Sequence, residues 1–94
     1  MSNRAASLTA KYDDFSDVLY MAISKPRDGV TYLETDEGLL LRVGPDGHTV
    51  GVTVEDYQYV WKARLDELAG VIALNLDVDP VTVRERLPSG HTTH

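Results

Sequence analysis

The spacing of apolar residues along this chain changes near residue 55, from every second residue to every third or fourth residue. In segment 49–54 three valines alternate with threonine and glycine, a pattern typical of a strand with one buried face. Beyond Asp56 the large apolar residues recur at intervals of four, three, four and four, namely Trp61, Leu65, Leu68, Ile72 and Leu76. This second spacing places them on one face of a helix. The change of period indicates an α+β domain whose strands come first.

Further segments with strand-like composition precede residue 49. Segments 8–12, 18–24, 30–35 and 39–43 are rich in β-branched, aromatic or aliphatic residues, with turn-forming residues between them. The clearest turn is Gly44-Pro45-Asp46-Gly47, because proline presets φ at the first central position and glycine supplies a positive φ. Short links favour antiparallel pairing, since parallel strands need connections of about a dozen residues or more. We therefore expect an antiparallel β-meander of four to five strands.

Two helices are expected to follow the strands. Asp56 is placed to cap a long amphipathic helix over about residues 57–74 with its carboxylate, and residues 75–77 are expected to end it. Asp79 followed by Pro80 predicts a short C-terminal helix over about residues 81–87, since proline is favoured at the first helical position. Residues 1–88 are expected to form one α+β domain, with 89–94 as a flexible tail.

The composition argues against several classes of protein. The chain has 94 residues, 43% of them hydrophobic, which suits one domain with one core. It has no cysteine, so it can form neither a disulfide framework nor a thiolate metal site, and a reducing cytoplasm is the expected compartment. The net charge of -6 disfavours attraction to phosphate backbones or anionic lipid. We see no targeting segment and no apolar run near the roughly 20 residues that span a bilayer.

Residues that could carry chemistry are present but not in a catalytic or ligand-binding pattern. The acidic residues at 13, 14 and 17 and at 36–37 match no calcium-binding loop, and aspartates in turns commonly accept bonds from nearby backbone N–H groups. The histidines, His48, His91 and His94, do not supply the rigid set of ligands that zinc needs. Ser16 and Ser24 lie in no nucleophile motif, and no glycine-rich loop joins a strand to a long helix. We expect no enzymatic activity, no metal and no cofactor.

Segment 18–24 is apolar on both of its sides, since Tyr20 and Leu19 point in opposite directions along the strand. One helix covers only one side of a sheet, so we expect the other side to meet a protein partner. A second copy is the simplest partner, because homodimers are the commonest oligomers. The predicted function is a small cytoplasmic interaction module, and the expected interface residues are Tyr20, Tyr57, Trp61, Leu65, Leu68 and Ile72.

Residues 65–87 support an alternative, a DNA-binding or antitoxin-like regulator. They resemble the second half of a helix-turn-helix, in which the second helix reads bases from the major groove. On that alignment the DNA contacts would be Thr82, Arg84 and Arg86. Asp77 stands where glycine usually makes the turn, and the acidic surroundings would repel phosphates. We therefore favour a short helix that packs through Val83 and Leu87.

The strand motifs, taken in order, resemble the DUF2283 family over about residues 11–56. The matching stretches are YDDFSDVLYMAI at 12–23, GLLL at 38–41 and DG at 46–47 followed by VGV at 50–52. The family pattern runs roughly YD-x3-D-x-LYI, a glycine-led strand, and DG-x-x-VGI-E. This chain departs from it by placing Thr53 and Val54 before Glu55 and by adding the stretch from Val71 onward. The resemblance implies the antiparallel strands of a small bacterial or archaeal protein, and it implies no reaction.

Overall fold

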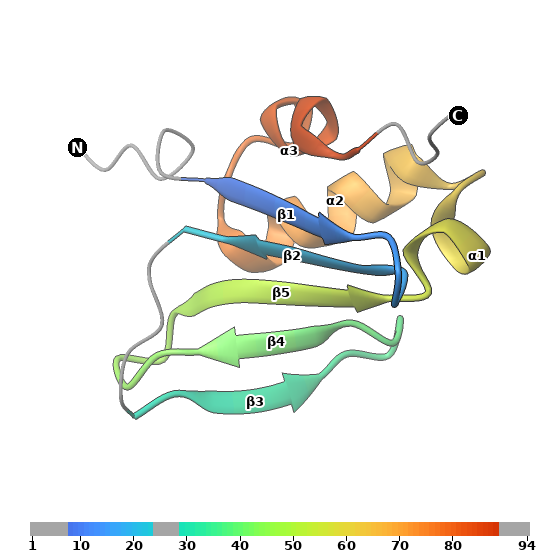
Figure 1. The fold of residues 1–94 in the computed structure, drawn as a ribbon. Helices are drawn as coiled ribbons and strands as arrows, with labels where there is room; N and C mark the ends of the chain where they lie inside the picture. Colours follow the sequence, from blue (N-terminus) through green and yellow to red (C-terminus); the bar gives the residue numbers. More distant parts are fainter. Residues whose placement is uncertain (1–7, 24–28, 89–94) are drawn as a thin grey trace.

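The computed structural model describes residues 8–23 and 29–88, and it contains one five-stranded antiparallel sheet followed by helices (Figure 1). The strands are β1 (Thr9–Asp13), β2 (Val18–Ala22), β3 (Thr31–Glu34), β4 (Leu40–Val43) and β5 (Thr49–Glu55). The helices are α1 (Tyr57–Trp61), α2 (Leu65–Leu76) and α3 (Pro80–Arg86). The predicted α+β class is confirmed, and the predicted tail 89–94 lies outside the described residues.

The order of strands in the sheet is β1-β2-β5-β4-β3, so it is not sequential throughout. Strands β3, β4 and β5 form a meander, and the β1–β2 hairpin joins it by pairing β2 with β5. The expected adjacency of β2 and β3 is therefore absent, and β5 occupies the centre. The reason lies in burial: β5 has three buried residues and the edge strand β3 has none, and a central strand has a neighbouring strand on each side.

Tight turns close the β3–β4 and β4–β5 hairpins in the same way. In the β4–β5 turn the N–H of Gly47 bonds the carbonyl of Gly44 at 2.9 Å, and Gly47 has φ 88°. In the β3–β4 turn the N–H of Gly38 bonds the carbonyl of Thr35 at 3.0 Å, and Gly38 has φ 90°. Each glycine occupies a conformation that L side chains rarely adopt. The hairpin predicted at residues 44–47 is confirmed.

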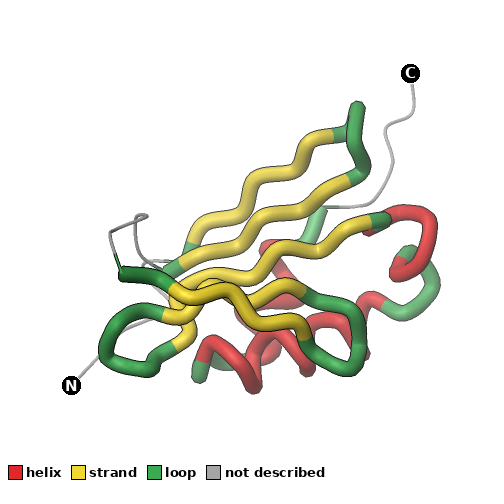
Figure 2. The backbone as a smooth tube through the Cα atoms, turned by 90° about the horizontal axis from the view of Figure 1, so that it is seen from below, coloured by secondary structure: helices red, strands yellow, loops and turns green. Residues whose placement is uncertain are grey.

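The core lies between one face of the sheet and the helices. The sheet contributes Leu19, Met21, Leu39, Leu41, Val52 and Val54, and the helical part contributes Tyr57, Trp61, Leu68, Ile72, Leu76 and Val83. The helices gather on the side of β1, β2 and β5, whereas the β3–β4 hairpin reaches past them (Figure 2). Within the described ranges, no helix is long and apolar enough to cross a membrane.

The long helix predicted over residues 57–74 is divided into α1 and α2. Arg64 adopts φ −133° and ψ 37°, which no helix interior allows, and its N–H bonds the carbonyl of Trp61 at 2.8 Å. Its guanidinium lies 4.5 Å from the ring centre of Trp61 and 2.7 Å from Glu67 Oε2. The chain thus bends between a short helix beside the β1–β2 turn and a longer one under the sheet. Local helix propensity gives no sign of this bend, because residues 62–64 are ordinary helix formers.

The ends of α2 and α3 agree with the expected boundaries. Helix α2 ends at Leu76, and Asp77 follows with φ 58° and its N–H bonded to the carbonyl of Ala73. Asp79 caps α3, because its side chain accepts the N–H of Val81 at 3.2 Å, and Pro80 takes the first helical position. The short helix predicted near residues 81–87 is confirmed.

Candidate functional site

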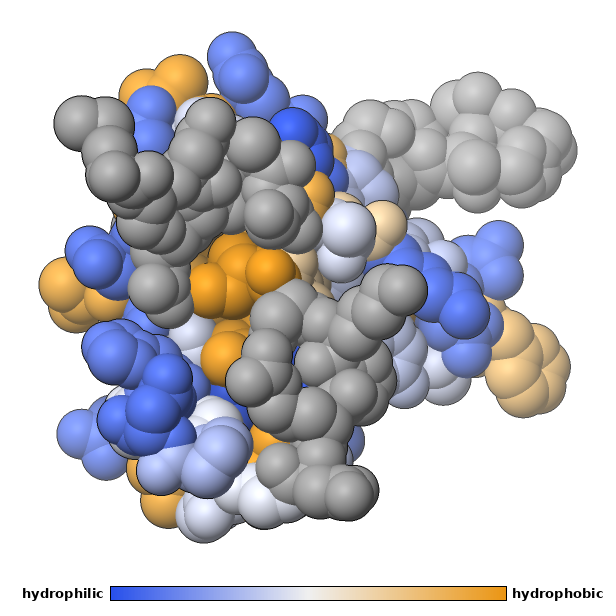
Figure 3. Space-filling view, turned by 90° about the vertical axis from the view of Figure 1, so that its left-hand side faces the viewer, coloured by the Kyte–Doolittle hydropathy of each residue, from blue (hydrophilic) through white to orange (hydrophobic). Residues whose placement is uncertain are grey.

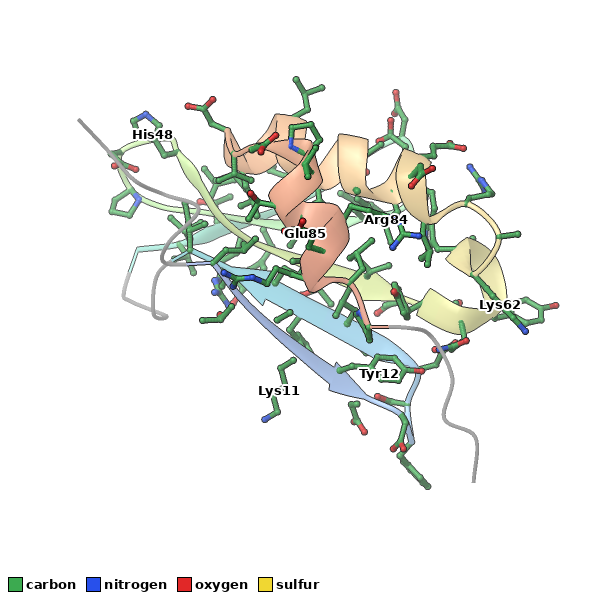
Figure 4. All side chains as sticks on the ribbon, turned by 90° about the horizontal axis from the view of Figure 1, so that it is seen from above. Lys11, Tyr12, His48, Lys62, Arg84 and Glu85 are labelled. Atoms are coloured by element: carbon green, nitrogen blue, oxygen red, sulfur yellow. The ribbon has the colours of Figure 1, made fainter. Side chains whose placement is uncertain are left out.

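The face of the sheet away from the helices carries two rows of side chains that run across the strands. The register places Lys11, Tyr20, Thr53, Leu40 and Glu34 side by side in one row, and Thr9, Ala22, Gly51, Arg42 and Tyr32 in the other. We call these ten residues the open face. Figure 4 shows Lys11 pointing away from the helices, while Tyr12, its neighbour in β1, points the other way. The open face combines aromatic rings, aliphatic groups and charges of both signs.

Gly51 lets the side chain of Arg42 lie across the middle of the open face. A Cβ placed on Gly51 would come within 2.8 Å of Arg42 Nη2 and 3.0 Å of Cζ, so the guanidinium occupies the space above this buried glycine. The Nε of Arg42 is buried and has no hydrogen-bond partner among the described residues. A buried N–H without an acceptor costs free energy, so binding of a partner that brings an acceptor to this N–H is favoured.

Tyr20 is the one member of the expected interface that is exposed, at 46% of its surface. Four others, Tyr57, Trp61, Leu68 and Ile72, are buried in the chain's own core, and Leu65 is partly buried against it. The expectation that the helix face meets a partner is corrected on this point: the sheet of the same chain covers it. Of segment 18–24, apolar on both of its sides, the chain buries only Leu19 and Met21 within β2.

The residues proposed for DNA contact lie on α3 and bond within the chain. Arg84 Nε donates to Asp66 Oδ1 at 2.8 Å, and Figure 4 shows Arg84 pointing from α3 toward α2. Arg86 Nη1 donates to the carbonyl of Leu8. Thr82 is half-buried and its hydroxyl lies 3.4 Å from Asp79 Oδ2. Helices α2 and α3 do form a helix pair with a three-residue link, residues 77–79, yet both arginines already have acceptors.

A shallow groove runs between α2 and α3 on the surface away from the sheet. Its volume is about 290 Å³, and it is lined by Asp66, Ala69, Pro80, Val81, Arg84 and Glu85. The apolar residues among those that line it, Ala69, Pro80 and Val81, are all small. Arg84 and Asp66, paired with each other, form one of its walls. Nothing in this arrangement converges on a ligand as catalytic or metal-binding side chains do.

Asp17 links the β1–β2 turn to the start of α1. Its Oδ1 accepts the N–H of Gln58 at 2.8 Å, its Oδ2 accepts the N–H of Tyr59 at 3.2 Å, and its carbonyl accepts the N–H of Tyr57 at 3.0 Å. The first turn of α1 is therefore capped from a residue about 40 positions earlier in the chain. The capping predicted for the carboxylate of Asp56 is wrong, since Asp56 has φ 55° and makes no side-chain cap bond.

Tyr12 completes this polar cluster and binds Asp17 from the other side. Its hydroxyl donates to Asp17 Oδ1 at 2.7 Å, and its ring lies 5.4 Å from the ring of Tyr57. Burial and the neighbouring carboxylate raise the pKa of Tyr12 to about 12, and burial raises the pKa of Tyr57 to about 12. Burial alone would raise the pKa of Asp17, but the bonds from Gln58, Tyr12 and Tyr59 outweigh it and lower this pKa. The cluster stabilises the ionised carboxylate of Asp17, and its role is structural because it connects the β1–β2 turn to the start of α1.

The remaining acidic and histidine residues have local partners. Asp13 accepts the N–H of Phe15 and the hydroxyl of Ser16, which confirms the predicted turn role. His48 Nδ1 lies 3.2 Å from Asp46 Oδ2 on the exposed β4–β5 turn. Within residues 8–23 and 29–88 no three histidines or acidic residues are grouped to hold a metal ion. Ser24, His91 and His94 lie outside the described residues.

The end of the sheet that carries the β4–β5 turn shows hydrophobic surface between the parts drawn in grey, with polar side chains around it (Figure 3).

Of the ten residues of the open face, only Tyr20 was predicted from the sequence as part of a contact surface. Tyr32 and Arg42 were missed, although the alternation of β3 and β4 would have placed them on that side once the strand order was known.

Comparison with known proteins gives one result. The family model described as protein of unknown function (DUF2283) matches residues 10–57, which begin at the second residue of β1 and end two residues past β5. No curated protein and no solved structure matches the chain. The matched residues include Tyr12, Asp13 and Asp17, so the YD-x3-D motif corresponds to the turn and capping cluster described above. This chain therefore belongs to the DUF2283 family, whose function is unknown.

Proposed function

We propose that this protein is a non-catalytic interaction module of the cytoplasm that acts as a homodimer, with the part of its sheet that the helices leave uncovered as the contact surface. One observation carries the proposal. Helices cover one face of the sheet, while Tyr20 and Tyr32 remain exposed on the other at 46% and 60% of their surfaces. Tyrosine is enriched at protein interfaces because it offers a large apolar ring and a polar tip.

The charges of the open face support a second copy as the partner. Lys11 and Arg42 are basic and Glu34 is acidic, so the surface has both signs although the chain is acidic overall. A two-fold interface brings the same patch of both copies together and therefore needs a self-complementary surface. A surface of mixed sign meets that need, whereas a uniformly acidic one would repel its copy.

Light scattering after size-exclusion chromatography tests the homodimer directly. We expect twice the mass of one chain at high micromolar concentration, with dissociation on dilution. A wild-type protein that stays monomeric at high micromolar concentration contradicts the proposal.

DNA binding through the α2–α3 helix pair is the alternative function. The charged side chains of this helix pair argue against DNA binding. Arg84 is paired with Asp66, and Arg86 donates to a backbone carbonyl. We expect no binding to random duplex DNA at tens of micromolar protein and low salt, measured by fluorescence anisotropy, where phosphate contacts appear most strongly. Binding that weakens with salt and is lost in Arg84→Ala would instead support the regulator.

A further inference from the structure

The two edges of the sheet differ in how they are protected. At the β1 edge, Lys11 is exposed, the carbonyl of Leu8 accepts a bond from Arg86, and α3 lies beside the strand (Figure 1). Strand β3 has the sequence Thr-Tyr-Leu-Glu, and all four residues are exposed. It has no lysine, proline or bulge, which are three of the means by which an edge strand avoids pairing with another chain, and its protection is limited to its short length and Glu34.

Leu33 exposes apolar surface on the helix side of β3. The register aligns it with Leu41, Val52 and Met21, which are all in the core. Leu33 itself is 52% exposed, because the helices do not extend as far as the β3–β4 hairpin (Figure 2). Since Tyr32 is exposed on the opposite face, this edge strand is apolar on both of its sides.

The backbone of β3 has hydrogen-bonding groups that point away from β4. The N–H of Thr35 bonds the carbonyl of Leu39 at 2.8 Å, and hydrogen-bonded pairs alternate along an antiparallel ladder. The pair Leu33–Leu41 is therefore bonded, and the pairs Tyr32–Arg42 and Glu34–Leu40 are not. The N–H and C=O groups of Tyr32 and Glu34 consequently face outward from the sheet.

We infer that β3 pairs antiparallel with β3 of a second copy, with Leu33 opposite the partner's Leu33, so that the two sheets become one. The inference rests on the proposed homodimer and places its contact at the β3 edge, which the helices leave uncovered on both faces. In this register Tyr32 lies opposite the partner's Glu34. The backbone N–H of each of these two residues donates to the backbone carbonyl of the other. The Tyr32 hydroxyl can also donate to the carboxylate opposite it.

This register also meets the symmetry that a dimer requires. A two-fold axis perpendicular to the sheet keeps the helices of both copies on one side and both open faces on the other. Residues that lie opposite each other across the two β3 strands then have their side chains on the same face of the joined sheet. The Leu33 side chains of the two copies are one such pair. The Leu33 pair is of the closely spaced, unbonded kind, in which side chains make the nearest contact.

The test uses opposite charges at position 33, with oligomeric mass measured by light scattering for each variant. Leu33→Lys and Leu33→Glu should each be monomeric at concentrations where the wild type is a dimer, since like charges directly opposite repel. An equimolar mixture of the two should regain the dimer mass. Both substitutions should leave the thermal midpoint of the monomer nearly unchanged, because the side chain is half-exposed.

Tyr20→Lys is the matched control, since it places the same charge on the open face away from this edge. A Tyr20→Lys protein that remains dimeric while Leu33→Lys is monomeric supports the inference. A dimer that survives Leu33→Lys overturns edge pairing but leaves the proposed homodimer standing, and a monomeric Tyr20→Lys would then locate it on the open face. A monomeric wild type overturns both.

Discussion

Replacing Ile72 with alanine should lower the free energy of unfolding by about 3 kcal/mol, the middle of the range for isoleucine deleted from a packed core. Ile72 is fully buried between α2 and the sheet, so the substitution leaves a cavity that its neighbours cannot fill without moving. Urea unfolding followed by circular dichroism at a fixed protein concentration measures the loss.

Leu74→Ala on the same helix is the control. Leu74 is 82% exposed, and its truncation should change the free energy of unfolding by less than about 0.5 kcal/mol. The oligomeric mass of Ile72→Ala should equal that of the wild type, because the side chain is buried in the chain's own core. A small loss of stability together with a change of mass would show that Ile72 contacts another subunit.

Asp17→Ala should cost about 2 kcal/mol of stability at neutral pH, because the change leaves the first N–H groups of α1 and the Tyr12 hydroxyl without an acceptor. The folded state lowers the pKa of Asp17, so its contribution is present above the ordinary carboxyl pKa of about 4 and is lost as pH falls below it. The wild type should therefore lose more stability than the variant between about pH 5 and pH 2.

Two further variants separate capping from backbone strain in this experiment. Asp17 has φ 61°, where alanine is strained but asparagine is tolerated. Asp17→Asn should thus keep part of the stability while losing the pH dependence. Asp14→Ala, in the same exposed turn, should change the free energy of unfolding by less than about 0.5 kcal/mol. Equal pH dependence in the wild type and both Asp17 variants would show that the cap is not electrostatic.

The strands, their turns and the last helix could be predicted because local chemistry determines them. Proline and glycine at 44–47 require a turn whatever surrounds them, and Asp79 with Pro80 starts a helix from its own side chains. The central position of β5 depends instead on the pairing of β2 with β5, and no local sequence pattern predicts that pairing. The same is true of α1, whose cap comes from a turn far away in the sequence.

The exposed surface of the sheet could be predicted only in part, for a related reason. Alternation shows which residues of a strand share a face, but not whether a neighbouring element covers that face. The apolar stripe from Trp61 to Ile72 suits a partner as well as it suits a core, and the sheet of the same chain covers it. Tyr32 and Leu33 become visible as surface only when β3 is known to be an edge.

The central position of β5 also constrains the order in which the sheet can assemble. As the chain leaves the ribosome, the β1–β2 and β3–β4 hairpins emerge before the strand that joins them, and an isolated two-stranded hairpin is marginally stable at best. The apolar face of each hairpin would stay exposed to solvent until residues 49–55 have been synthesised. Pairing of β2 with β5 closes a loop of more than 25 residues, so we expect this step, and not the formation of either hairpin, to set the rate of folding.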